Sequence, residues 1–236
     1  MIDTAILLAA GQGSRLRGVA ASKPLCPVAG RPLIDHALSG LANAGMRRAI
    51  VVVGYRGADI RAHLARGRWG LAVDVVESDP LRPNGVSVLA GAMALAAGEQ
   101  AVLAMCDHLV DPLLYARLAA NGAQDGLTLG IDRRLGHAWV DPLDVTAVAT
   151  SGDRIVAIGK GLEPHDAYDT GVFAVGARLF AALAGFGNPS LTDGVRVLAG
   201  EGRAHVVDCS DLDWIDVDDA PAHAQAEAWA SAARAA

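Results

Sequence analysis

The chain has 236 residues, a net charge of −6 and 52% hydrophobic residues, few of which are aromatic. This length allows one or two domains around a core built mainly from alanine, valine and leucine, and we expect a single domain over residues 1–236. The negative charge argues against nucleic acids and membrane surfaces as partners.

Cysteine usage and the N-terminal sequence indicate the compartment. Cys26, Cys106 and Cys209 have no metal-ligand spacing and are odd in number, which is typical of buried thiols in a reducing compartment. The N-terminus has no signal-peptide pattern, and the longest apolar run, Val86 to Ala97, is too short to span a membrane. We therefore expect a cytoplasmic protein without membrane insertion. The sequence leaves open whether two copies form a homodimer.

Apolar runs of strand length alternate with helical segments through the first half of the chain. The expected strands are Ala5–Ala9, Ala49–Val53, Ala72–Val76, Ala101–Met105 and Leu127–Ile131. The expected helices are Leu33–Ala44, Ala58–Ala65, Val86–Ala97 and Pro112–Asn121. Apolar strands separated by helices predict a Rossmann-like α/β fold, in which helices cover both faces of a mostly parallel sheet. Ligands of such sheets bind beyond the carboxyl ends of the strands, which places Gly11, Ser78, Asp79 and Asp107 at one edge.

The loop after the first expected strand has the composition of a phosphate-binding site. Gly11 and Gly13 allow the backbone to approach a bulky anion, so that successive N–H groups point at its oxygens. The loop has no carboxylate, and its cations are Arg15, Arg17, Lys23 and Arg31. Such cations supply the countercharge of a polyphosphate, whereas a plain tight turn would not explain them.

Two common phosphate-binding loops do not fit this segment. A P-loop needs Gly-x-x-x-x-Gly-Lys-Ser/Thr, and the sequence has no such string. A dinucleotide fingerprint needs a third glycine where Leu16 stands, and an acid where Gly54, Tyr55 and Arg56 follow the second strand. The loop is therefore predicted to bind a polyphosphate in a different way.

Two further features follow along the first half of the chain. Asn84 and Gly85 open a helix where a nucleotide base could lie, or they form an ordinary turn. Asp107 ends a buried strand, where a carboxylate costs desolvation energy unless a metal or a cation pairs with it. Because Asp111 is the better N-cap for the next helix, Asp107 is predicted to bind a metal. For His108, packing and contact with a substrate both stay open.

The pattern becomes β-rich after Asp132, as in an insertion. Asp144–Thr150 and Arg154–Gly159 are predicted to form a hairpin, and Tyr168–Val175 a further strand. Lys160 follows the hairpin between two glycines, and there it is either a solvated charge or, as we favour, a contact for the phosphate of a second substrate. Ala220–Ala235 is expected to form a closing helix with a proline just inside its start.

A second acidic segment lies before this closing helix. It contains no basic residue, and its acids are Asp208, Asp211, Asp213, Asp216, Asp218 and Asp219. In an extended backbone Asp216 and Asp218 point the same way. Mg²⁺ is usually held by one or two carboxylates, phosphate oxygens and waters, so Asp107 with Asp216 is the favoured pair of ligands. Asp218 is the alternative second ligand, and Asp218 or Asp219 could instead cap the closing helix.

The motifs resemble those of a known family. L-A-A-G-Q-G-S-R-L (residues 8–16) with K-P-L (23–25) resembles the signature of nucleotidyltransferases that activate sugar phosphates and similar phosphomonoesters. Five further segments resemble, in order and across nearly the whole chain, the CTP:inositol-1-phosphate cytidylyltransferases. They are P-N-G-V-S (83–87), M-C-D-H (105–108), I-G-K (158–160), Y-D-T-G (168–171) and W-I-D-V-D (214–218).

The resemblance implies the fold of nucleotide-diphospho-sugar transferases and a division of labour along the chain. Residues 1–132 would form the nucleotide-binding half, 133–218 the acceptor-binding and metal half, and 219–236 the closing helix. Arg15, Lys23 and Lys160 would act in catalysis, with Mg²⁺ on Asp107 and Asp216 or Asp218. The expected acceptor contacts are His108, Lys160, Asp169, Thr170 and Gly171. The expected nucleotide contacts are Leu8, Ala9, Ala10, Gly11, Gly13, Ser14, Arg15, Lys23, Ser78, Asp79, Asn84, Gly85, Ser87 and Asp107.

The implied reaction joins CTP to a small phosphorylated alcohol, such as inositol 1-phosphate, and releases pyrophosphate. Two alternatives stay open at this point. The same fold could use UTP or dTTP with a hexose 1-phosphate, or CTP with phosphocholine. The chain could also be a regulatory subunit that binds a nucleotide without turnover, although such a subunit would not need a second acid.

Overall fold

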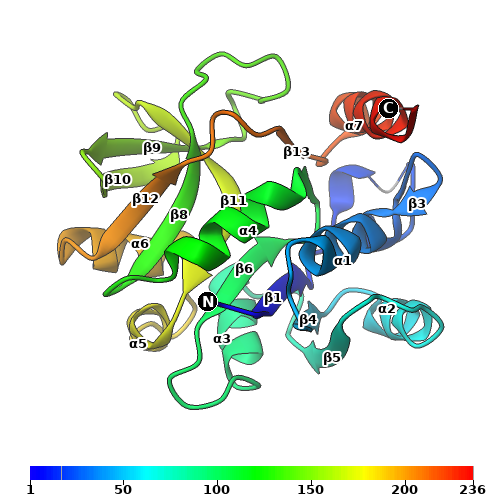
Figure 1. Ribbon diagram of the computed structural model, residues 1–236, viewed down its shortest axis with the longest axis horizontal. Helices are drawn as coiled ribbons and strands as arrows, with labels where there is room; N and C mark the ends of the chain where they lie inside the picture. The colour runs from blue at the N-terminus through cyan, green and yellow to red at the C-terminus, as the bar shows by residue number, and fades with distance from the viewer. Residues whose placement is uncertain (17, 236) are drawn as a thin grey trace.

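The computed structural model describes residues 1–16 and 18–235 and shows one large mixed sheet with helices on both sides (Figure 1). The sheet order is β5-β4-β1-β6-β11-β8-β12-β10-β9. The bounds of these strands are β1 Thr4–Ala9, β4 Arg48–Val53, β5 Ala72–Glu77, β6 Ala101–Met105, β8 Leu127–Asp132, β9 Thr146–Ser151, β10 Arg154–Lys160, β11 Ala167–Val175 and β12 Ala204–Asp208. The helices are α1 Leu33–Asn43, α2 Gly57–Leu64, α3 Asn84–Ala92, α4 Pro112–Asn121, α5 Ala177–Ala184, α6 Leu191–Gly200 and α7 Ala220–Ala235.

The first half of the sheet is parallel, as predicted. β5, β4, β1 and β6 lie side by side and run in one direction. Their carboxyl ends are level, because Leu8 is opposite Met105 and Ala9 is opposite Val53. The loops that follow β1, β5 and β6 therefore start from one edge, which confirms the edge expected for Gly11, Ser78 and Asp107.

The second half of the sheet continues the first. β11 runs antiparallel between β6 and β8, and β12 is parallel to β8. The predicted hairpin forms from β9 and β10 and adds to the far end of the same sheet. β9 also pairs with β11, where Val148 is opposite Ala167, so this end of the sheet curls back on itself. The β-rich segment is thus an extension of the main sheet.

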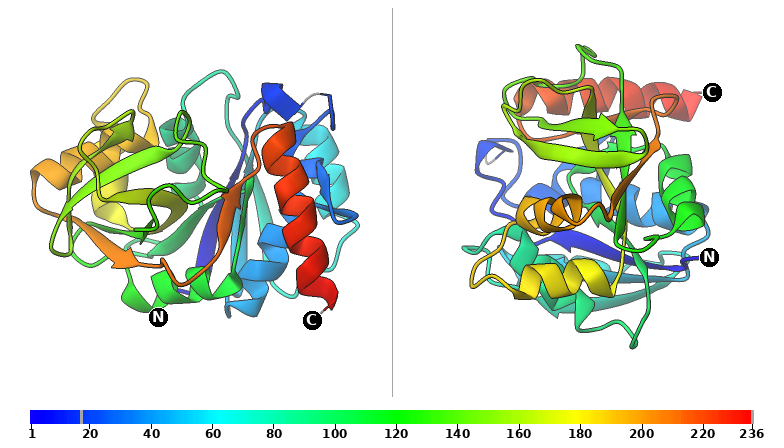
Figure 2. Two further views of the ribbon diagram at one scale, coloured as in Figure 1. Left: turned by 90° about the horizontal axis from the view of Figure 1, so that it is seen from above. Right: turned by 90° about the vertical axis from the view of Figure 1, so that its left-hand side faces the viewer.

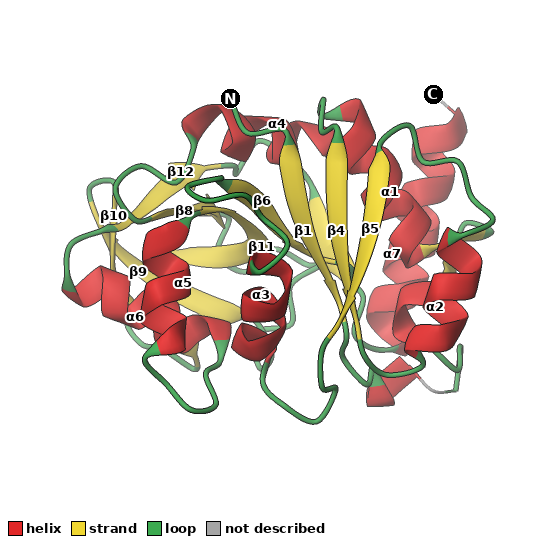
Figure 3. Ribbon diagram, turned by 90° about the horizontal axis from the view of Figure 1, so that it is seen from below, coloured by secondary structure: helices red, strands yellow, loops and turns green. Residues whose placement is uncertain are grey.

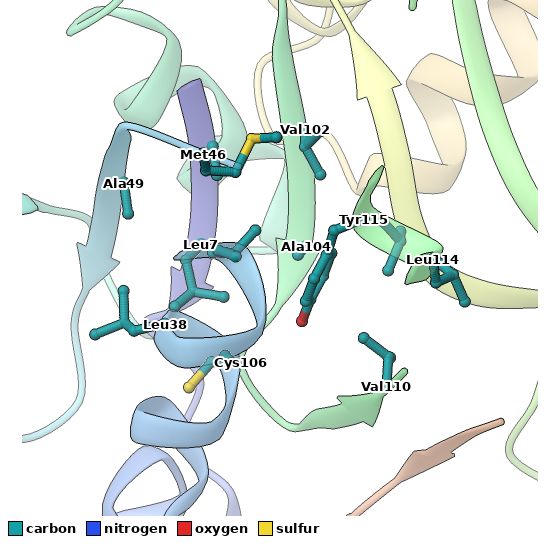
Figure 4. Close-up of a cluster of buried hydrophobic side chains, with 14 of the residues drawn as sticks. Leu7, Leu38, Met46, Ala49, Val102, Ala104, Cys106, Val110, Leu114 and Tyr115 are labelled. Atoms are coloured by element: carbon teal, nitrogen blue, oxygen red, sulfur yellow. The ribbon is translucent and has the colours of Figure 1, made fainter. Parts of the chain in front are cut away.

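Helices cover both faces of the sheet, which confirms the predicted architecture. α1, α2 and α4 pack on one face, and α3, α5 and α6 pack on the other (Figure 3). Strand residues alternate between the two cores: Leu7 of β1 belongs to the first and Ile6 to the second. In Figure 4, Leu7 and the β6 residues Val102 and Ala104 lie near Leu38 of α1 and Tyr115 of α4.

A third, smaller core fixes the segments around the glycine loop. α7 lies along two short ribbons, β2–β3 (Pro27–Val28 and Arg31–Pro32) and β7–β13 (His108–Val110 and Trp214–Asp216), as Figures 1 and 2 show. Ala226 and Ala230 of α7 belong to the same core as Leu16, Val28 and Ile215. The closing helix therefore holds the loop after β1 against the acidic segment near the end of the chain.

Several elements differ from the sequence predictions. α3 starts at Asn84 and ends at Ala92, whereas Val86–Ala97 was expected. Ala94 and Leu95 still pack on the second core after the helix has ended in tight turns, so the apolar periodicity outlasts the helix. α5, α6 and β12 were not predicted. Arg17, one of the predicted loop cations, lies outside the described residues. No helix in the described part of the chain is long and apolar enough to cross a membrane.

Candidate active site

Lys23 lies directly beside the glycine loop, in the 3₁₀ turn η2 (Lys23–Leu25). Gly13 has a φ of +54°, and a Cβ at this position would lie 2.4 Å from Cβ of Lys23. Glycine therefore satisfies both the left-handed backbone and the close packing at this point. As a result the lysine is only 6% exposed, which is rare for this residue type unless its charge is paired.

The ammonium group of Lys23 is surrounded by carboxylates. Nζ lies 2.6 Å from Oδ2 of Asp107 and 3.7 Å from Oδ1 of Asp216, and it donates a hydrogen bond to Oδ1 of Asp218. Burial alone would lower the pKa of Lys23, but these three carboxylates outweigh it and raise the pKa above its usual value. The lysine is therefore charged at neutral pH and links the glycine loop to the acids.

The acids meet because two short strands pair. Asp107 follows β6, and the next three residues form β7, which pairs antiparallel with β13. In this register Asp216 lies opposite His108, and the backbone N–H of Val217 donates to the carbonyl of Asp107 at 3.0 Å. The fold thus brings Arg15, Lys23, Asp107 and Asp216 to one place, as the sequence interpretation required.

Asp144 connects the predicted nucleotide and acceptor residues and was not predicted as a site residue. Its Oδ2 accepts a hydrogen bond from Arg15 at 2.5 Å, and its Oδ1 accepts one from Lys160. Arg15 also donates to Asp218. Burial would raise the pKa of Asp144, but the hydrogen bonds from Lys160 and Arg15 outweigh it and lower the pKa. Asp144 is therefore an anion between two cations.

His108 is held by both of its ring nitrogens. Nδ1 lies 2.9 Å from the carbonyl oxygen of Thr170, and Nε2 lies 3.4 Å from Oδ2 of Asp216. Burial would lower the pKa of His108, but Asp216 and Asp107 outweigh it and raise the pKa to about 10. The imidazole is therefore protonated at neutral pH, donates from Nδ1 to the carbonyl and forms an ion pair with Asp216.

The segment Asp169–Gly171 forms the wall next to this histidine. Gly171 has a φ of +78°, and a Cβ there would lie 2.0 Å from Nδ1 of His108. The hydroxyl group of Thr170 is buried and donates to the carbonyl of Gly130 at 2.7 Å, so this side chain anchors the wall. Burial raises the pKa of Asp169 to about 6, although its hydrogen bond from the N–H of Gly171 opposes the shift.

Two cavities meet at this charged cluster. The glycine-loop cavity, of about 210 Å³, is lined by Leu8, Ala9, Gly11, Gly13, Ser14, Arg15, Lys23, Pro24, Cys106, Asp107 and Asp218. The hairpin cavity, of about 240 Å³, extends from the cluster towards β10 and α6 and includes Lys160 and Thr192 in its lining. Arg15, Asp107 and Asp218 line both. A group bound in one cavity would therefore reach a group bound in the other across these three side chains.

Most of the predicted nucleotide contacts line the glycine-loop cavity. Asn84 instead lines the hairpin cavity. Five residues with a predicted nucleotide contact are not among the lining residues of either cavity: Ala10, Ser78, Asp79, Gly85 and Ser87. Ser87 donates to Ser78 at 2.9 Å, and Oδ1 of Asn84 accepts from the N–H of Leu191, so this segment binds to the start of α6.

The predicted acceptor contacts His108, Lys160, Asp169 and Gly171 line the hairpin cavity. The cavity also has lining residues that the sequence interpretation missed, among them Trp139, Asp141, Asp144, Thr192 and Trp214. Trp214 had a visible signal, since it precedes the acid pair by two residues. Asp219 caps α7 by accepting from the N–H of Ala222 at 2.8 Å, so Asp218 is the acid that contacts Lys23 and Arg15.

Two groups of side chains at the cluster have the donors that a divalent cation needs. They are Asp107, His108 and Asp216, and Asp144, Asp216 and Asp218, with ligand atoms within 4.8 Å of one another in each group. The protonated imidazole of His108 would have to lose a proton before it could bind a metal. Oδ1 of Asp216 is buried without a hydrogen-bond partner in the described part of the chain. Burial and Asp216 raise the pKa of Asp218 to about 6, so this carboxylate gains from a nearby cation. Clustered carboxylates and one free oxygen fit a hard cation such as Mg²⁺.

Comparison with known proteins agrees with this fold. Residues 5–140, more than half of the chain, match the family described as "MobA-like NTP transferase domain". The chain belongs to this family of nucleotidyltransferases.

Individual relatives cover nearly the whole chain. A "Bifunctional IPC transferase and DIPP synthase" of Rubrobacter xylanophilus is 36% identical over 91% of the chain and 49% of the relative. A "CMP-5'-(3-aminopropyl)phosphonate synthase" of Streptomyces rubellomurinus is 30% identical over 94% of the chain and 38% of the relative. The chain thus spans about half the length, or less, of these curated relatives. The solved "inositol-1-phosphate CTP transferase from T. maritima" shares the fold, with a TM-score of 0.84, 24% identity and coverage of 94% and 91% of the two chains.

Proposed function

We propose that this domain is a Mg²⁺-dependent cytidylyltransferase, which converts CTP and inositol 1-phosphate to CDP-inositol and pyrophosphate. The observation that carries the proposal is the meeting of two cavities at Arg15, Asp107 and Asp218, with Lys23 buried among the acids. The names of the Rubrobacter and T. maritima proteins support CTP and inositol 1-phosphate as the substrate pair.

The reaction sets an electrostatic problem more than a proton-transfer problem. An oxygen of the acceptor phosphate attacks the α-phosphorus of CTP. The bond from this phosphorus to the oxygen that bridges the α- and β-phosphates breaks, and the electron pair of that bond leaves with pyrophosphate. The attacking phosphate carries about two negative charges near neutral pH, so it needs no general base. Two like unit charges ~4 Å apart repel by ~4 kcal/mol at an effective dielectric of ~20. Neutralisation and alignment are therefore what the protein must supply.

Three cations at the site would supply both. Lys23 and Arg15, on the glycine-loop side, bind the charge that develops on the α-phosphate and pyrophosphate. Lys160, on the hairpin side, binds and aims the acceptor phosphate. Asp169 lines the same cavity, and its carboxyl group can accept a hydrogen bond from a hydroxyl group of the acceptor. His108 lines it too, as part of the wall, with both ring nitrogens already paired.

Asp107 and Asp216 would hold Mg²⁺, with Asp218 as the alternative second ligand. When bound, the ion neutralises charge on the phosphoryl oxygens as a Lewis acid. Because Lys23 already pairs with all three carboxylates, it limits the negative charge of the cluster, and this favours a single divalent ion over two.

An activity grid tests the proposal. Pyrophosphate release would be measured for CTP, UTP, dTTP and ATP, each with inositol 1-phosphate, glucose 1-phosphate, phosphocholine and (3-aminopropyl)phosphonate, with Mg²⁺ and with EDTA. We expect the fastest release for CTP with inositol 1-phosphate and none with EDTA. CDP-inositol would be identified by mass spectrometry.

Several other outcomes would point to defined alternatives. UTP or dTTP with glucose 1-phosphate as the best pair would show a sugar-nucleotide synthase, and CTP with phosphocholine would show another cytidylyltransferase. CTP binding without release for any acceptor would favour a non-catalytic regulatory subunit. Release that is unaffected by EDTA would overturn the role of the metal.

A further inference from the structure

The β7–β13 ribbon that carries the metal-binding acids is too short to hold itself in place. Each strand has three residues, and an isolated pair of this length is not stable in water. Its register nevertheless decides the site, because a shift by one residue would turn Asp216 to the opposite face. Ile215 packs in the third core and holds one face of β13, and the other face needs a contact of its own.

Trp214 is the residue through which the main sheet can hold this other face. It precedes Asp216 by two positions in β13, so both side chains are on the same face of the strand. Trp214 is 4% exposed and lines the hairpin cavity, and its ring lies 6.0 Å from the ring of His108. Its indole Nε1 donates a buried hydrogen bond to Oδ2 of Asp132 at 2.8 Å.

Asp132 ties this indole to the main sheet. It is the last residue of β8, is paired with Tyr168 of β11 and is completely buried. Its carboxylate also accepts hydrogen bonds from the backbone N–H and the guanidinium group of Arg134, at distances of 2.8–3.1 Å. Arg134 in turn donates to the carbonyl of Leu212 at 2.7 Å and to Asp213 at 3.0 Å. The segment before β13 is thus bound to the end of β8 at several points.

Burying a carboxylate costs desolvation free energy, and this cost can cancel the Coulombic gain of its ion pair. Stability alone therefore does not account for a buried Asp132. We propose that Asp132 is a positioning residue of the active site: through Trp214 it fixes the face and register of β13 and so places Asp216 beside His108 and Lys23. This inference rests on the proposed function for the catalytic importance of Asp216. The contacts from Asp132 through Trp214 to β13 do not depend on it.

The test compares Asp132→Ala with Asp132→Asn. The asparagine keeps an oxygen that accepts from the indole, whereas the alanine removes it. Asp166→Ala is the control, because Asp166 accepts from Arg133 and Thr150 in the same half of the sheet and lines neither cavity. The measurements are Mn²⁺ affinity by electron paramagnetic resonance, kcat, KM for CTP, the melting temperature, and the His108 imidazole NMR resonances of the metal-free protein.

For Asp132→Ala we expect Mn²⁺ affinity and kcat to fall by about 10-fold or more, as is typical when a residue that orients a metal ligand is lost. KM for CTP should change less than kcat, since most of the glycine-loop cavity is formed by residues 8–24, away from β13, and the His108 resonances should shift. Asp132→Asn should keep Mn²⁺ affinity and kcat within about threefold, because its oxygen still accepts from the indole. Its melting temperature should fall, because the buried ion pair with Arg134 is lost. The melting temperature of Asp166→Ala should fall, whereas its Mn²⁺ affinity should not change.

The inference is overturned if Asp132→Ala has a lower melting temperature but unchanged Mn²⁺ affinity and kcat. It is also overturned if Asp132→Asn loses as much Mn²⁺ affinity and kcat as the alanine variant. Should Asp132→Ala not fold, Trp214→Phe keeps the ring and removes only the N–H donor, and wild-type Mn²⁺ affinity in that variant would overturn the inference as well. Failure of the proposed function would look different. A wild-type protein that binds no Mn²⁺ and releases no pyrophosphate would still give the His108 comparison in the metal-free state.

Discussion

The two cavities that meet at Asp107 are built in opposite ways. The glycine-loop cavity is lined mainly by one continuous stretch, residues 8–24, with Cys106, Asp107 and Asp218 added from elsewhere. The hairpin cavity draws its lining from several separate segments between Arg15 and Ala222, the largest contributions coming from residues 139–146 and 214–222. A cavity of the first kind depends on local backbone geometry, whereas the second depends on how distant elements pack.

The difference also appears in the chemistry of the linings. The glycine-loop cavity offers backbone groups and the cations Arg15 and Lys23, which suit a polyphosphate that every reaction of this class shares. The hairpin cavity adds aromatic and acidic side chains, such as Trp139, Asp141 and Asp169. If the proposed function is correct, specificity for the acceptor would reside in the hairpin cavity. This division makes different variants fail in different ways.

The largest effect is expected on the glycine-loop side. Lys23→Met should lower kcat about 10²–10³-fold, because it removes a preorganised donor for transition-state charge. Arg31→Met is the matched control: Arg31 belongs to the same basic loop but donates to Ser39 and to the carbonyl of Asp35, outside both cavities. Steady-state pyrophosphate release would separate the two variants. A rise in KM with an unchanged kcat for Lys23→Met would contradict its role in the transition state.

A smaller and more selective loss is expected on the hairpin side. Gly171→Ala would place a Cβ 2.0 Å from Nδ1 of His108, so the imidazole must move. Gly152→Ala is the control, because Gly152 also has a positive φ of +62° but no atom within 4 Å of its Cβ. An alanine with a positive φ costs about 1 kcal/mol of backbone strain in both variants, but only Gly171→Ala displaces His108.

We therefore expect Gly171→Ala to raise KM for inositol 1-phosphate by about 10-fold, which corresponds to ~1.4 kcal/mol. KM for CTP should not change, and Gly152→Ala should keep both values. Equal losses for the two substrates in Gly171→Ala would show that the cavities are not independent.

Asp144 contacts both Arg15 and Lys160, so a variant at this position tests whether the two cavities are coupled. In Asp144→Asn, the ammonium group of Lys160 loses its ion pair with the carboxylate of Asp144. The lysine side chain must then be ordered when the acceptor binds, which costs about 0.5–1.5 kcal/mol. KM for inositol 1-phosphate should thus rise about two- to tenfold, with kcat less affected. Asp141→Asn removes the same charge from the same cavity but keeps an oxygen that accepts from the N–H of Leu143. If both variants behave alike, the total charge of the cavity matters and the ion pair does not.

The contrast between the cavities explains what the sequence could predict. Gly11, Gly13 and Lys23 lie close together in the chain, so their shared role was visible in composition and spacing. The burial of Lys23 among three acids was not, because it requires the pairing of β7 with β13. Asp144 was placed at the start of a predicted strand, but β9 begins at Thr146, and the cations that bind Asp144 come from other parts of the chain.

The missed elements have similar physical reasons. α6 starts with a capping box formed by Ser190 and Asp193, a signal that the sequence does contain. β12 is short and only partly buried along most of its length, so it lacks the continuous apolar run of a central strand. The end of α3 was placed too late because apolar residues continue beyond the helix. Most buried strands and the glycine loop were predictable, and β5 was predicted although it is only partly buried. α6 was missed although its capping box is a local signal, whereas β12 depends on its neighbours in the sheet.

The smallest effect concerns the ion pair between His108 and Asp216, measured without metal. Burial lowers the pKa of His108, but the two acids outweigh it and raise the pKa to about 10, against about 6.5 in an unfolded chain. The folded state therefore binds the proton more tightly. The contribution of the pair to stability is complete below pH ~6.5 and is lost as the pH rises through the folded pKa.

In EDTA, the melting temperature of the wild type should exceed that of His108→Gln at pH 6, because the folded state binds the proton of His108 more tightly than the unfolded chain does. The difference should shrink steadily as the pH rises towards 10. Groups that titrate in both proteins cancel in this comparison, so the remaining slope belongs to the histidine. In an Asp216→Asn background the pH dependence of the difference should largely vanish, because the main partner is gone. A difference that stays constant with pH would mean that His108 stabilises the hairpin cavity by packing alone.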